Sequence, residues 1–262
     1  MILESIAQAN RERYEEIKKA VPLEVVNAQA EKLNSNTGFP FEKALKKQGL
    51  SYICEVKKAS PSKGVIAENF PYLEIAKDYE KAGASAISCL TETKWFMGND
   101  RYLKEIAQEV SIPVLRKDFT VDVYQIFEAK VLGASAVLLI CAILDEKTIS
   151  QWIRVCDSLG LSALVEAHTE QEVDMALKAG ARIIGVNNRN LKDFTVDINT
   201  CKRLRKKVPD DIIFVGESGI STAEDIKSLK ENKVDAVLIG ETLMRSKDKT
   251  EALCKLNGGS LI

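Results

Sequence analysis

Short apolar runs alternate with amphipathic segments over most of the chain. The runs are rich in β-branched residues and indicate strands at residues 52–56, 86–90, 114–116, 136–141, 162–165, 183–186, 212–215 and 236–239. The segments between them repeat apolar residues at helical spacing and predict helices over 72–81, 100–109, 123–131, 146–159, 170–178, 198–207, 223–232 and 243–256. Strands that are apolar on both faces and alternate with helices are typical of a parallel sheet covered by helices.

A short repeated motif supports this count of units. The segments AGASAI at 82–87, LGASAV at 132–137 and AGARII at 179–184 are near copies, and each places a glycine helix stop before the next strand. A fourth copy, VDAV at 234–237, lacks the glycine. Eight such units in roughly 200 residues favour a (β/α)₈ TIM barrel over an open doubly wound sheet. The lack of a G-x-G-x-x-G motif after the first strand also disfavours a dinucleotide-binding fold.

The first fifty residues do not show this alternation of strands and helices, and their pattern predicts helices. Apolar residues recur at roughly helical spacing, and Pro22 separates two segments. A polar loop at 34–40 leads to a short helix at 41–48. We therefore expect one domain over residues 1–262, in which residues 1–50 form an N-terminal helical extension of the barrel.

The composition narrows the range of partners. Of the 262 residues 45% are apolar and 29% charged, as in an ordinary globular protein. A net charge of −1 gives no general attraction to nucleic acid or to an anionic membrane, so any anion site must be local. The opening residues mix apolar side chains with charges of both signs, which predicts neither a signal peptide nor a membrane span and favours the cytoplasm.

Cysteine and histidine limit the available chemistry. The six cysteines are far apart, without a C-x-x-C pair, and fit a reducing compartment. His168 is the only histidine, which argues against the usual zinc sites and against histidine-based triads, and we interpret it as structural. Proton transfer would then depend mainly on Lys, Glu or Asp.

The stretch 51–64, SYICEVKKASPSKG, combines a strand with a polar turn. Alternation places Ile53, Glu55 and Lys57 on one face and Cys54 and Val56 on the other. A carboxylate and an ammonium on one face can be a structural ion pair or part of a solvated edge strand. Their position at the carboxyl end of the strand favours a functional role, because the loop at 60–64 suits anion contact and mobility.

Other predicted strands also end in polar residues, namely Lys117, Glu166, Asn187, Arg189 and Glu217, and the last strand ends at Gly240. Polar strand ends are expected wherever strands reach solvent. Several of these polar residues, however, lie two positions after apolar residues that face the interior, so they are on the same face of their strands. They would then point into one enclosed mouth, where barrel enzymes have their active sites. In such a cluster we expect neighbouring cations and desolvation to lower the pKa of a lysine, and neighbouring carboxylates to raise that of a glutamate. That arrangement would supply acid and base without histidine.

Two further sets of residues suggest ligand contacts. Glycine turns at 216–220 and 239–242 precede helices in the last two units, where barrels often bind phosphate. Trp95, Phe96 and Phe119 follow the second and third strands and could wall an aromatic ligand or simply cover the barrel mouth. The basic runs at 202–207 and 227–233 are most simply solvated helix faces.

Several of these segments together resemble the indole-3-glycerol phosphate synthase family over nearly the whole chain. The matching segments are EVKKASPSKG at 55–64, LTE at 90–92 with FMG at 96–98, LRKDF at 115–119, LVE at 164–166, NNRNL at 187–191, GESGI at 216–220 and IGE at 239–241. The resemblance implies a (β/α)₈ barrel with its extra N-terminal helices over the mouth. It also implies ring closure of 1-(2-carboxyphenylamino)-1-deoxyribulose 5-phosphate to indole-3-glycerol phosphate, with loss of CO₂ and water and without cofactor or metal.

The resemblance also implies roles for single residues. Lys117 is similar to the general acid of ring closure, and Glu166 to the acid/base of dehydration. Glu55 resembles a residue that orients the catalytic lysine, and Lys57 one that bridges substrate and phosphate. Which of the two lysines is the acid in the dehydration stays open.

The remaining matched positions concern substrate contacts. Asn187 and Glu217 match polar groups at the reacting centre, and Ser60 and Arg189 match residues near the anthranilate carboxylate. Phe96 and Phe119 would flank the aromatic ring, and Leu191 and Ser218 belong to the same substrate-binding set. Phosphate would lie on the backbone of Gly219, Gly240 and Glu241, near Lys57. Glu241 stands where family members can carry serine, so its side chain is expected to point to water.

The resemblance gives a small phosphorylated molecule as the partner, and a monomer that can associate loosely with other enzymes of tryptophan biosynthesis. Two rival functions remain open. An isomerase acting on a phosphoribosyl-anthranilate could use a Cys and an Asp, whereas a non-catalytic barrel would bind phosphorylated metabolites without turnover.

Overall fold

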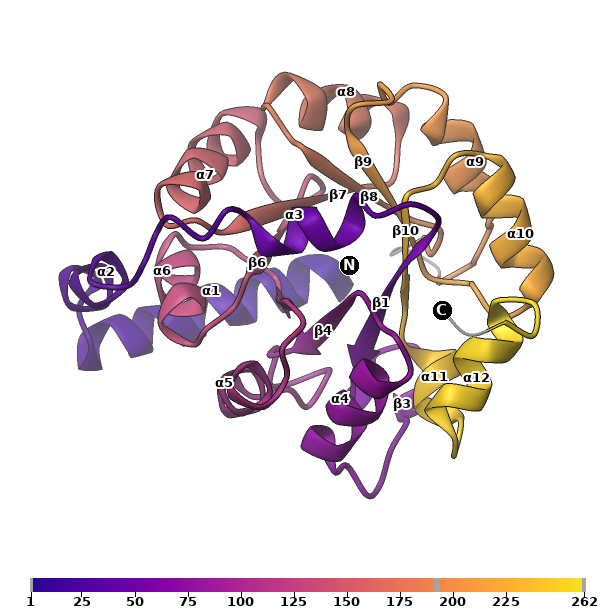
Figure 1. The fold of residues 1–262 in the computed structure, drawn as a ribbon. Coiled ribbons are helices and arrows are strands. Elements are labelled where there is room, and N and C mark those ends of the chain that lie inside the picture. The colour runs from indigo at the N-terminus through magenta and orange to yellow at the C-terminus, as the bar shows by residue number, and fades with distance from the viewer. Residues whose placement is uncertain (1, 191–193, 261–262) are drawn as a thin grey trace.

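The computed structural model describes residues 2–190 and 194–260. Eight parallel strands close into a barrel in the order β1-β10-β9-β8-β7-β6-β5-β4, surrounded by helices (Figure 1). The strands are β1 (Ser51–Val56), β4 (Ala86–Leu90), β5 (Val114–Lys117), β6 (Ala136–Ile140), β7 (Ser162–Ala167), β8 (Ile183–Asn187), β9 (Ile213–Glu217) and β10 (Ala236–Ile239). Pairing of β1 with β10, which sets Ser51 opposite Ala236, completes the ring and confirms the predicted TIM barrel.

The helices around the barrel follow the predicted segments closely. They are α4 (Tyr72–Lys81), α5 (Asp100–Glu109), α6 (Tyr124–Val131), α7 (Glu146–Ser158), α8 (Glu170–Lys178), α9 (Asn199–Arg205), α10 (Ala223–Glu231), α11 (Glu241–Arg245) and α12 (Lys249–Leu256). The single helix predicted over 243–256 is wrong, because α11 and α12 are separate. The Lys249 ammonium donates to the carbonyl oxygens of Leu243 in α11 and of Ser246 just after it, and the Asp248 side chain caps α12.

Strand alternation divides the apolar side chains into two clusters. Ile53, Leu115, Leu164 and Ile183 belong to the cluster that fills the barrel, together with residues of the other strands. Cys54 and the other outward residues pack in the larger cluster beneath the surrounding helices. The predicted parity is therefore confirmed, and residues two positions past the inward apolar side chains point toward the barrel mouth.

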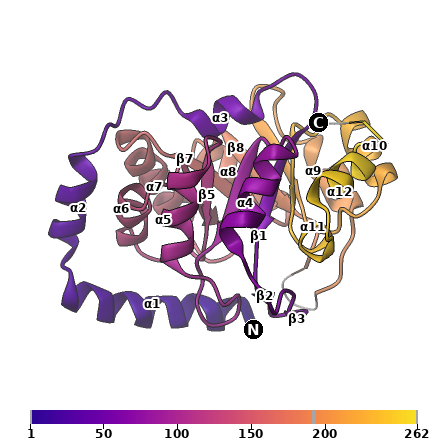
Figure 2. The ribbon, with the colours of Figure 1, turned by 60° about the horizontal axis from the view of Figure 1, so that its bottom comes forward.

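The N-terminal extension has three helices with different locations (Figure 2). Helix α1 (Ile2–Ala20) lies across the end of the barrel where the strands finish, α2 (Leu23–Glu31) runs beside α6, and α3 (Pro40–Leu45) lies at the opposite end. Phe41 and Leu45 of α3 are buried against the apolar cluster inside the barrel. The expectation that the extension covers the mouth therefore holds for α1 alone, because α3 closes the opposite end of the barrel.

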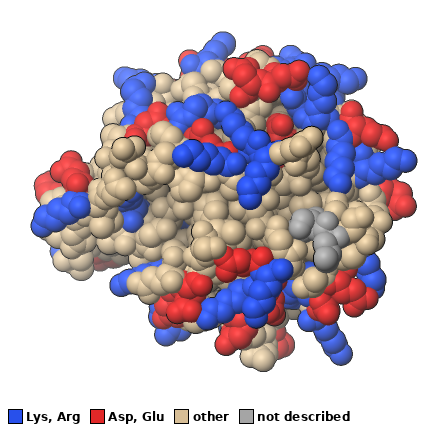
Figure 3. All heavy atoms as spheres, in the orientation of Figure 1, with Lys and Arg blue, Asp and Glu red and all other residues tan. Residues whose placement is uncertain are grey.

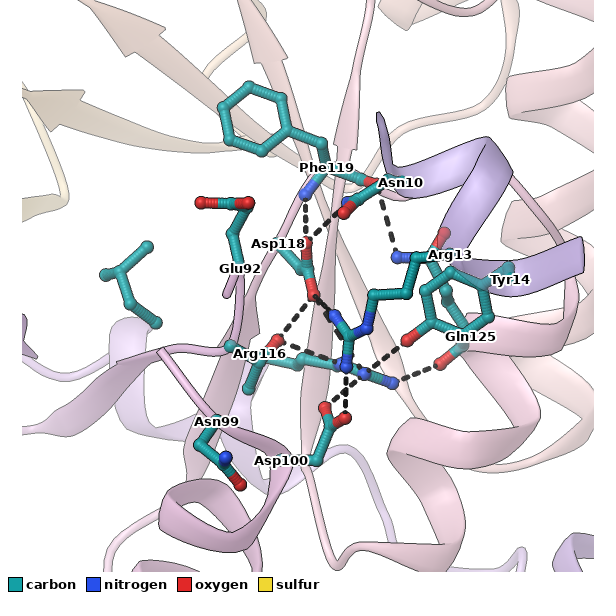
Figure 4. Close-up of polar contacts among 12 residues, drawn as sticks. Asn10, Arg13, Tyr14, Glu92, Asn99, Asp100, Arg116, Asp118, Phe119 and Gln125 are labelled. Carbon is teal, nitrogen blue, oxygen red and sulfur yellow. Dashed lines mark hydrogen bonds and ion pairs between the residues drawn. The ribbon is translucent and has the colours of Figure 1, made fainter. Parts of the chain in front are cut away.

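Polar contacts hold α1 against the end of β5 (Figure 4). The buried Asn10 amide donates to the Asp118 carboxylate at 2.8 Å and to the Phe119 carbonyl oxygen at 2.9 Å. Lys117 lies between Arg116 and Asp118 in sequence but points to the barrel interior. The two faces of one strand therefore serve different purposes, one toward α1 and one toward the mouth.

Arg116 is the centre of these contacts, and its side chain is only 1% exposed. One guanidinium nitrogen lies 2.8 Å from the Tyr14 hydroxyl, 2.5 Å from Asp100 and 2.8 Å from Glu128. Arg13 of α1 pairs with the same Asp100 at 2.6 Å. A buried charge is tolerated when it is paired and hydrogen-bonded in this way, so Arg116 links α1, α5 and α6 to the barrel.

Charges of both signs are interspersed on the face shown in Figure 3, around an uncharged central area. The prediction that the basic run at 202–207 is only a solvated face is wrong for Arg205, which is buried and donates to the carbonyl oxygens of Lys233 and Val208. All six cysteines are free thiols. In the described parts of the chain, none of the helices combines the length and apolar character that a membrane-spanning helix needs.

We predict that Arg116→Gln lowers the free energy of unfolding by about 3–5 kcal/mol, because it removes the buried partner of an ion-pair network and leaves Glu128 without its cation. Urea denaturation followed by circular dichroism measures the change. Lys207→Gln is the control, since it also removes a cation from an ion pair, but at the surface, where Lys207 is 39% exposed beside Glu170. Equal effects of the two substitutions would contradict this view of Arg116.

Candidate active site

A cavity of about 380 Å³ opens at the mouth of the barrel, beneath the start of α1. All of the predicted site residues that lie within the described ranges line this cavity. They are Glu55, Lys57, Ser60, Phe96, Lys117, Phe119, Glu166, Asn187, Arg189, Glu217, Ser218, Gly219, Gly240 and Glu241. The remaining predicted residue, Leu191, lies outside the described residues. The barrel therefore brings together groups from widely separated parts of the sequence.

Lysines and glutamates form the floor of this cavity. The Lys117 ammonium lies 3.5 Å from Glu166 Oε2 and 3.9 Å from Glu217 Oε2. The Lys57 ammonium lies 2.5 Å from Glu55 Oε1. Glu55 therefore pairs directly with Lys57 and acts on Lys117 through its charge.

The pKa of Lys117 lies above the ordinary lysine value, so the prediction of a lowered lysine pKa is wrong here. Burial alone would lower it, but the negative charges of Glu166, Glu217 and Glu55 outweigh the loss of solvent. Lys117 is thus held as an ammonium ion. It can donate a proton to a developing oxyanion, but it is not poised to act as a base near neutral pH.

The two glutamates beside Lys117 differ in protonation. Burial, together with the negative charge of Glu166, raises the pKa of Glu217 to about 8. For Glu166, burial also favours the neutral acid, but Lys117, His168 and a hydrogen bond from Asn187 outweigh it and hold its pKa below the ordinary value. The predicted raising of a glutamate pKa is therefore confirmed for Glu217, and the pair combines one carboxylic acid with one carboxylate.

Glycines let the backbone come close to these charges. A side chain on Gly240 would begin 2.3 Å from Glu55 Oε1 and 2.8 Å from Lys57 Nζ, so any other residue would displace this ion pair. Gly219 has φ of +75°, and a Cβ there would lie 2.3 Å from Val196. Both turns therefore expose backbone to the cavity. The first turn of α10 is already capped by Thr222 and Asp225, so an anion would contact the turns themselves.

Glu241 differs from its expected orientation. Its carboxylate lies 3.5 Å from Lys63, 4.0 Å from Arg189 and 3.2 Å from Arg245, instead of pointing only to water. These cations offset the repulsion between Glu241 and a bound phosphate. Lys63 belongs to the turn between β2 (Ala59–Ser60) and β3 (Gly64–Val65), so Glu241 also connects this hairpin to the last unit of the barrel.

Aromatic side chains also line the cavity. The rings of Phe96 and Phe119 have centroids 5.9 Å apart and line the cavity together. The buried Glu92 accepts hydrogen bonds from the backbone of Trp95 and Phe96 and so fixes the turn that carries Phe96. Trp95 does not line the cavity, whereas Phe194 does, in addition to the two predicted phenylalanines.

Some lining residues were not identified from the sequence. Ile2, Leu3 and Ile6 of α1 reach the cavity, as does Arg245. Their helical periodicity showed only that α1 buries one face, without indicating which surface it covers.

His168 was interpreted as structural, but its imidazole Nε2 lies 3.6 Å from Glu166 Oε1. Its position two residues after Glu166 was the available signal. The described residues contain no cluster of three or more His, Cys, Asp or Glu that could hold a metal ion.

A closed parallel barrel whose mouth is lined by glycine turns and by a lysine–glutamate cluster defines an acid–base enzyme acting on a small anionic substrate. A family model described as indole-3-glycerol phosphate synthase matches residues 3–256. The chain belongs to the indole-3-glycerol phosphate synthase family.

Relatives named indole-3-glycerol phosphate synthase match almost end to end. The protein of Ruminiclostridium cellulolyticum is 58% identical over 260 residues, which cover 99% of this chain and 100% of the relative. That of Endomicrobium trichonymphae is 53% identical over 257 residues, covering 98% and 99% respectively.

Solved structures of other enzymes share the fold. A 3-hexulose-6-phosphate synthase aligns with a TM-score of 0.63 at 13% identity, covering 80% of this chain and 99% of its own. A thiamine phosphate pyrophosphorylase from Pyrococcus furiosus aligns with a TM-score of 0.59 at 17% identity, covering 80% and 94%. At this identity the likeness concerns the barrel alone.

The high pKa of Glu217 predicts a specific pH dependence of stability. Folded Glu217 keeps its proton up to about pH 8, whereas an ordinary glutamic acid loses it near 4.5. The folded protein therefore binds more protons between these values, so the contribution of this group to stability is full below pH 4.5 and is lost as the pH rises through 8.

Glu217→Gln removes this titration. We expect the free energy of unfolding of the variant, relative to the wild type, to increase between about pH 5 and pH 9 in urea denaturation series. Glu16→Gln on the outer face of α1, where Glu16 is 73% exposed, serves as the control. A difference between Glu217→Gln and wild type that is constant with pH would show that Glu217 titrates normally.

Proposed function

We propose that this protein closes the indole ring of 1-(2-carboxyphenylamino)-1-deoxyribulose 5-phosphate with the Lys117–Glu166–Glu217 cluster at the barrel mouth. The observation that carries the proposal is the Lys117 ammonium, held among buried carboxylates in a cavity that has an aromatic wall and a glycine cradle. The three features match the three parts of the substrate: its ketone, its aromatic ring and its phosphate.

In the first step, the aromatic carbon that bears the carboxylate attacks the ketone carbon of the ribulose chain. Negative charge develops on the ketone oxygen, and Lys117 donates a proton to it. Because the carboxylates fix this ammonium before the substrate arrives, little reorganisation accompanies the reaction. Loss of CO₂ then returns the electron pair to the ring.

In the second step, the new hydroxyl group leaves as water. Glu166 acts as the acid/base of this dehydration, and Asn187 orients its carboxylate through the side-chain hydrogen bond. Glu217 is the neighbouring acid, with a proton available at neutral pH. The proton for the leaving hydroxyl comes from one of the two lysines, Lys117 or Lys57, of which Lys57 is paired with Glu55.

Substrate contacts follow from the position of the cradle and the wall. The phosphate lies on the backbone of Gly219, Gly240 and Glu241, with the Lys57 ammonium beside it. Phe96 and Phe119 flank the anthranilate ring. The anthranilate carboxylate faces Arg189 and Ser60, and Ser218 completes the substrate-binding set.

The rival isomerase reaction finds less support. It would draw on a cysteine and an aspartate, and neither residue type occurs among the described residues that line the cavity. Mixing protein with the deoxyribulose substrate, without metal or cofactor, tests the proposal through CO₂ release and the appearance of indole fluorescence. Binding without either signal would instead favour a non-catalytic barrel.

We also propose that the protein is a cytoplasmic monomer. Light scattering coupled to size-exclusion chromatography measures the oligomeric state directly. Loose association with other enzymes of tryptophan biosynthesis is compatible with a complete site in a single chain.

Lys117→Ala is expected to lower kcat by about 10²–10⁴-fold, because it removes the general acid, while substrate affinity changes much less. Single-turnover rates measure the chemical step, and fluorescence titration measures binding. Lys104→Ala removes an exposed lysine of α5 and serves as the control. A Lys117→Ala variant with nearly normal kcat would exclude Lys117 from the mechanism.

A further inference from the structure

His168 lies directly behind Glu166 as seen from the cavity. It follows β7 by one residue, and its side chain is 14% exposed. Its Nε2 atom lies 3.6 Å from Glu166 Oε1, whereas the other oxygen of the same carboxylate lies 3.5 Å from Lys117. Each oxygen of Glu166 therefore faces one nitrogen base, one from β5 and one from the end of β7.

A second carboxylate holds the far side of the imidazole. His168 Nδ1 lies 3.5 Å from Glu172 Oε2, and the His168 backbone N–H donates to the same oxygen at 2.6 Å. Glu172 is in the first turn of α8, where its own N–H donates to the Thr169 hydroxyl that caps the helix. The start of α8 thus fixes the position of the ring.

The geometry favours the doubly protonated, imidazolium form of His168. Both ring nitrogens are shielded from solvent, and neither makes a hydrogen bond within the described structure. Their distances to the Glu166 and Glu172 carboxylates are longer than hydrogen bonds and correspond to ion pairs. A neutral imidazole has one N–H group and would turn a lone pair toward one carboxylate. An imidazolium directs an N–H group to each.

Other charged groups near His168 do not change this balance. Lys117 of β5 repels the imidazolium, and Arg203 of α9 and Asp197, which have opposite charges, line the same cavity as His168. Burial also works against the cation, but Glu172 and Glu166 outweigh burial and Lys117, and the pKa of His168 lies above its usual value.

We propose that His168, held by Glu172, is a positioning residue that keeps Glu166 ionised and aimed at the reacting centre. It does not touch the substrate in this proposal and acts only through Glu166. The inference rests on the proposed role of Glu166 as the acid/base of dehydration. Its physical content is that a cation on each side fixes both the charge and the rotation of the Glu166 carboxylate.

The test is the pH dependence of kcat in His168→Gln and Glu172→Gln. Loss of the imidazolium raises the pKa at which Glu166 ionises, so the acid limb of the kcat profile is expected to move to higher pH by about one unit. At neutral pH, kcat is expected to fall about ten- to a hundred-fold because the carboxylate is less well placed, with KM little changed. The double variant should resemble His168→Gln, since Glu172 acts through the ring.

A purely structural role would give a different result. A partly unfolded variant loses amplitude at every pH but keeps the position of the acid limb, so an unmoved limb in either single variant overturns the inference. Glu170→Gln is the matched control, because Glu170 is on the same turn of α8 but pairs with Lys207 at the surface. Its profile should equal that of the wild type.

Glu166→Gln separates this inference from the proposed function. If that variant keeps nearly normal kcat, Glu166 is not the acid/base and the role proposed for it fails. If Glu166→Gln is inactive while His168→Gln leaves the acid limb in place, only the positioning role of His168 is wrong.

Discussion

The Lys117 ammonium is the charge that allows three buried glutamates to share one end of the barrel. Without it, Glu55, Glu166 and Glu217 would repel one another in a region that excludes much of the solvent. With it, one glutamate is an anion and another keeps a proton to about pH 8. The same attraction holds Lys117 in the charged form, and together with burial and His168 it sets the protonation states on which the proposed acid–base chemistry depends.

The barrel makes that interaction possible by its register. Parallel strands direct alternate side chains inward, and the charged residues follow the last inward apolar residue of their strands. In β5 the outward neighbours of Lys117 are just as important. Arg116 and Asp118 join α1 to the barrel, so the helix that covers the mouth is attached at the strand that carries the ammonium. Covering the mouth limits the access of water, which strengthens every charge interaction inside.

At the phosphate end of the cavity, neighbouring cations accommodate the carboxylate of Glu241. Glu241 places a carboxylate near the expected phosphate, yet Lys63, Arg189 and Arg245 surround it. The local charge near the cradle therefore stays favourable for an anion, although the chain as a whole has a net charge of only −1. Because Lys63 belongs to the β2–β3 hairpin, the same carboxylate also links the hairpin to the barrel.

The sequence by itself determined the repeating strand–helix units, the inward face of each strand and the identity of nearly all the cavity residues. Periodicity and parity are local properties, and they survive folding because the apolar faces must be buried. Only the tertiary structure decided the pairings: Glu55 with Lys57, Glu166 with Lys117 and His168, and Arg116 with α1. It also decided that the pKa of Lys117 is raised, that α3 closes the end of the barrel opposite the mouth and that His168 faces a candidate catalytic carboxylate. These outcomes depend on distances between residues far apart in sequence or on how a side chain turns at a strand end, and no local pattern of residues encodes those distances.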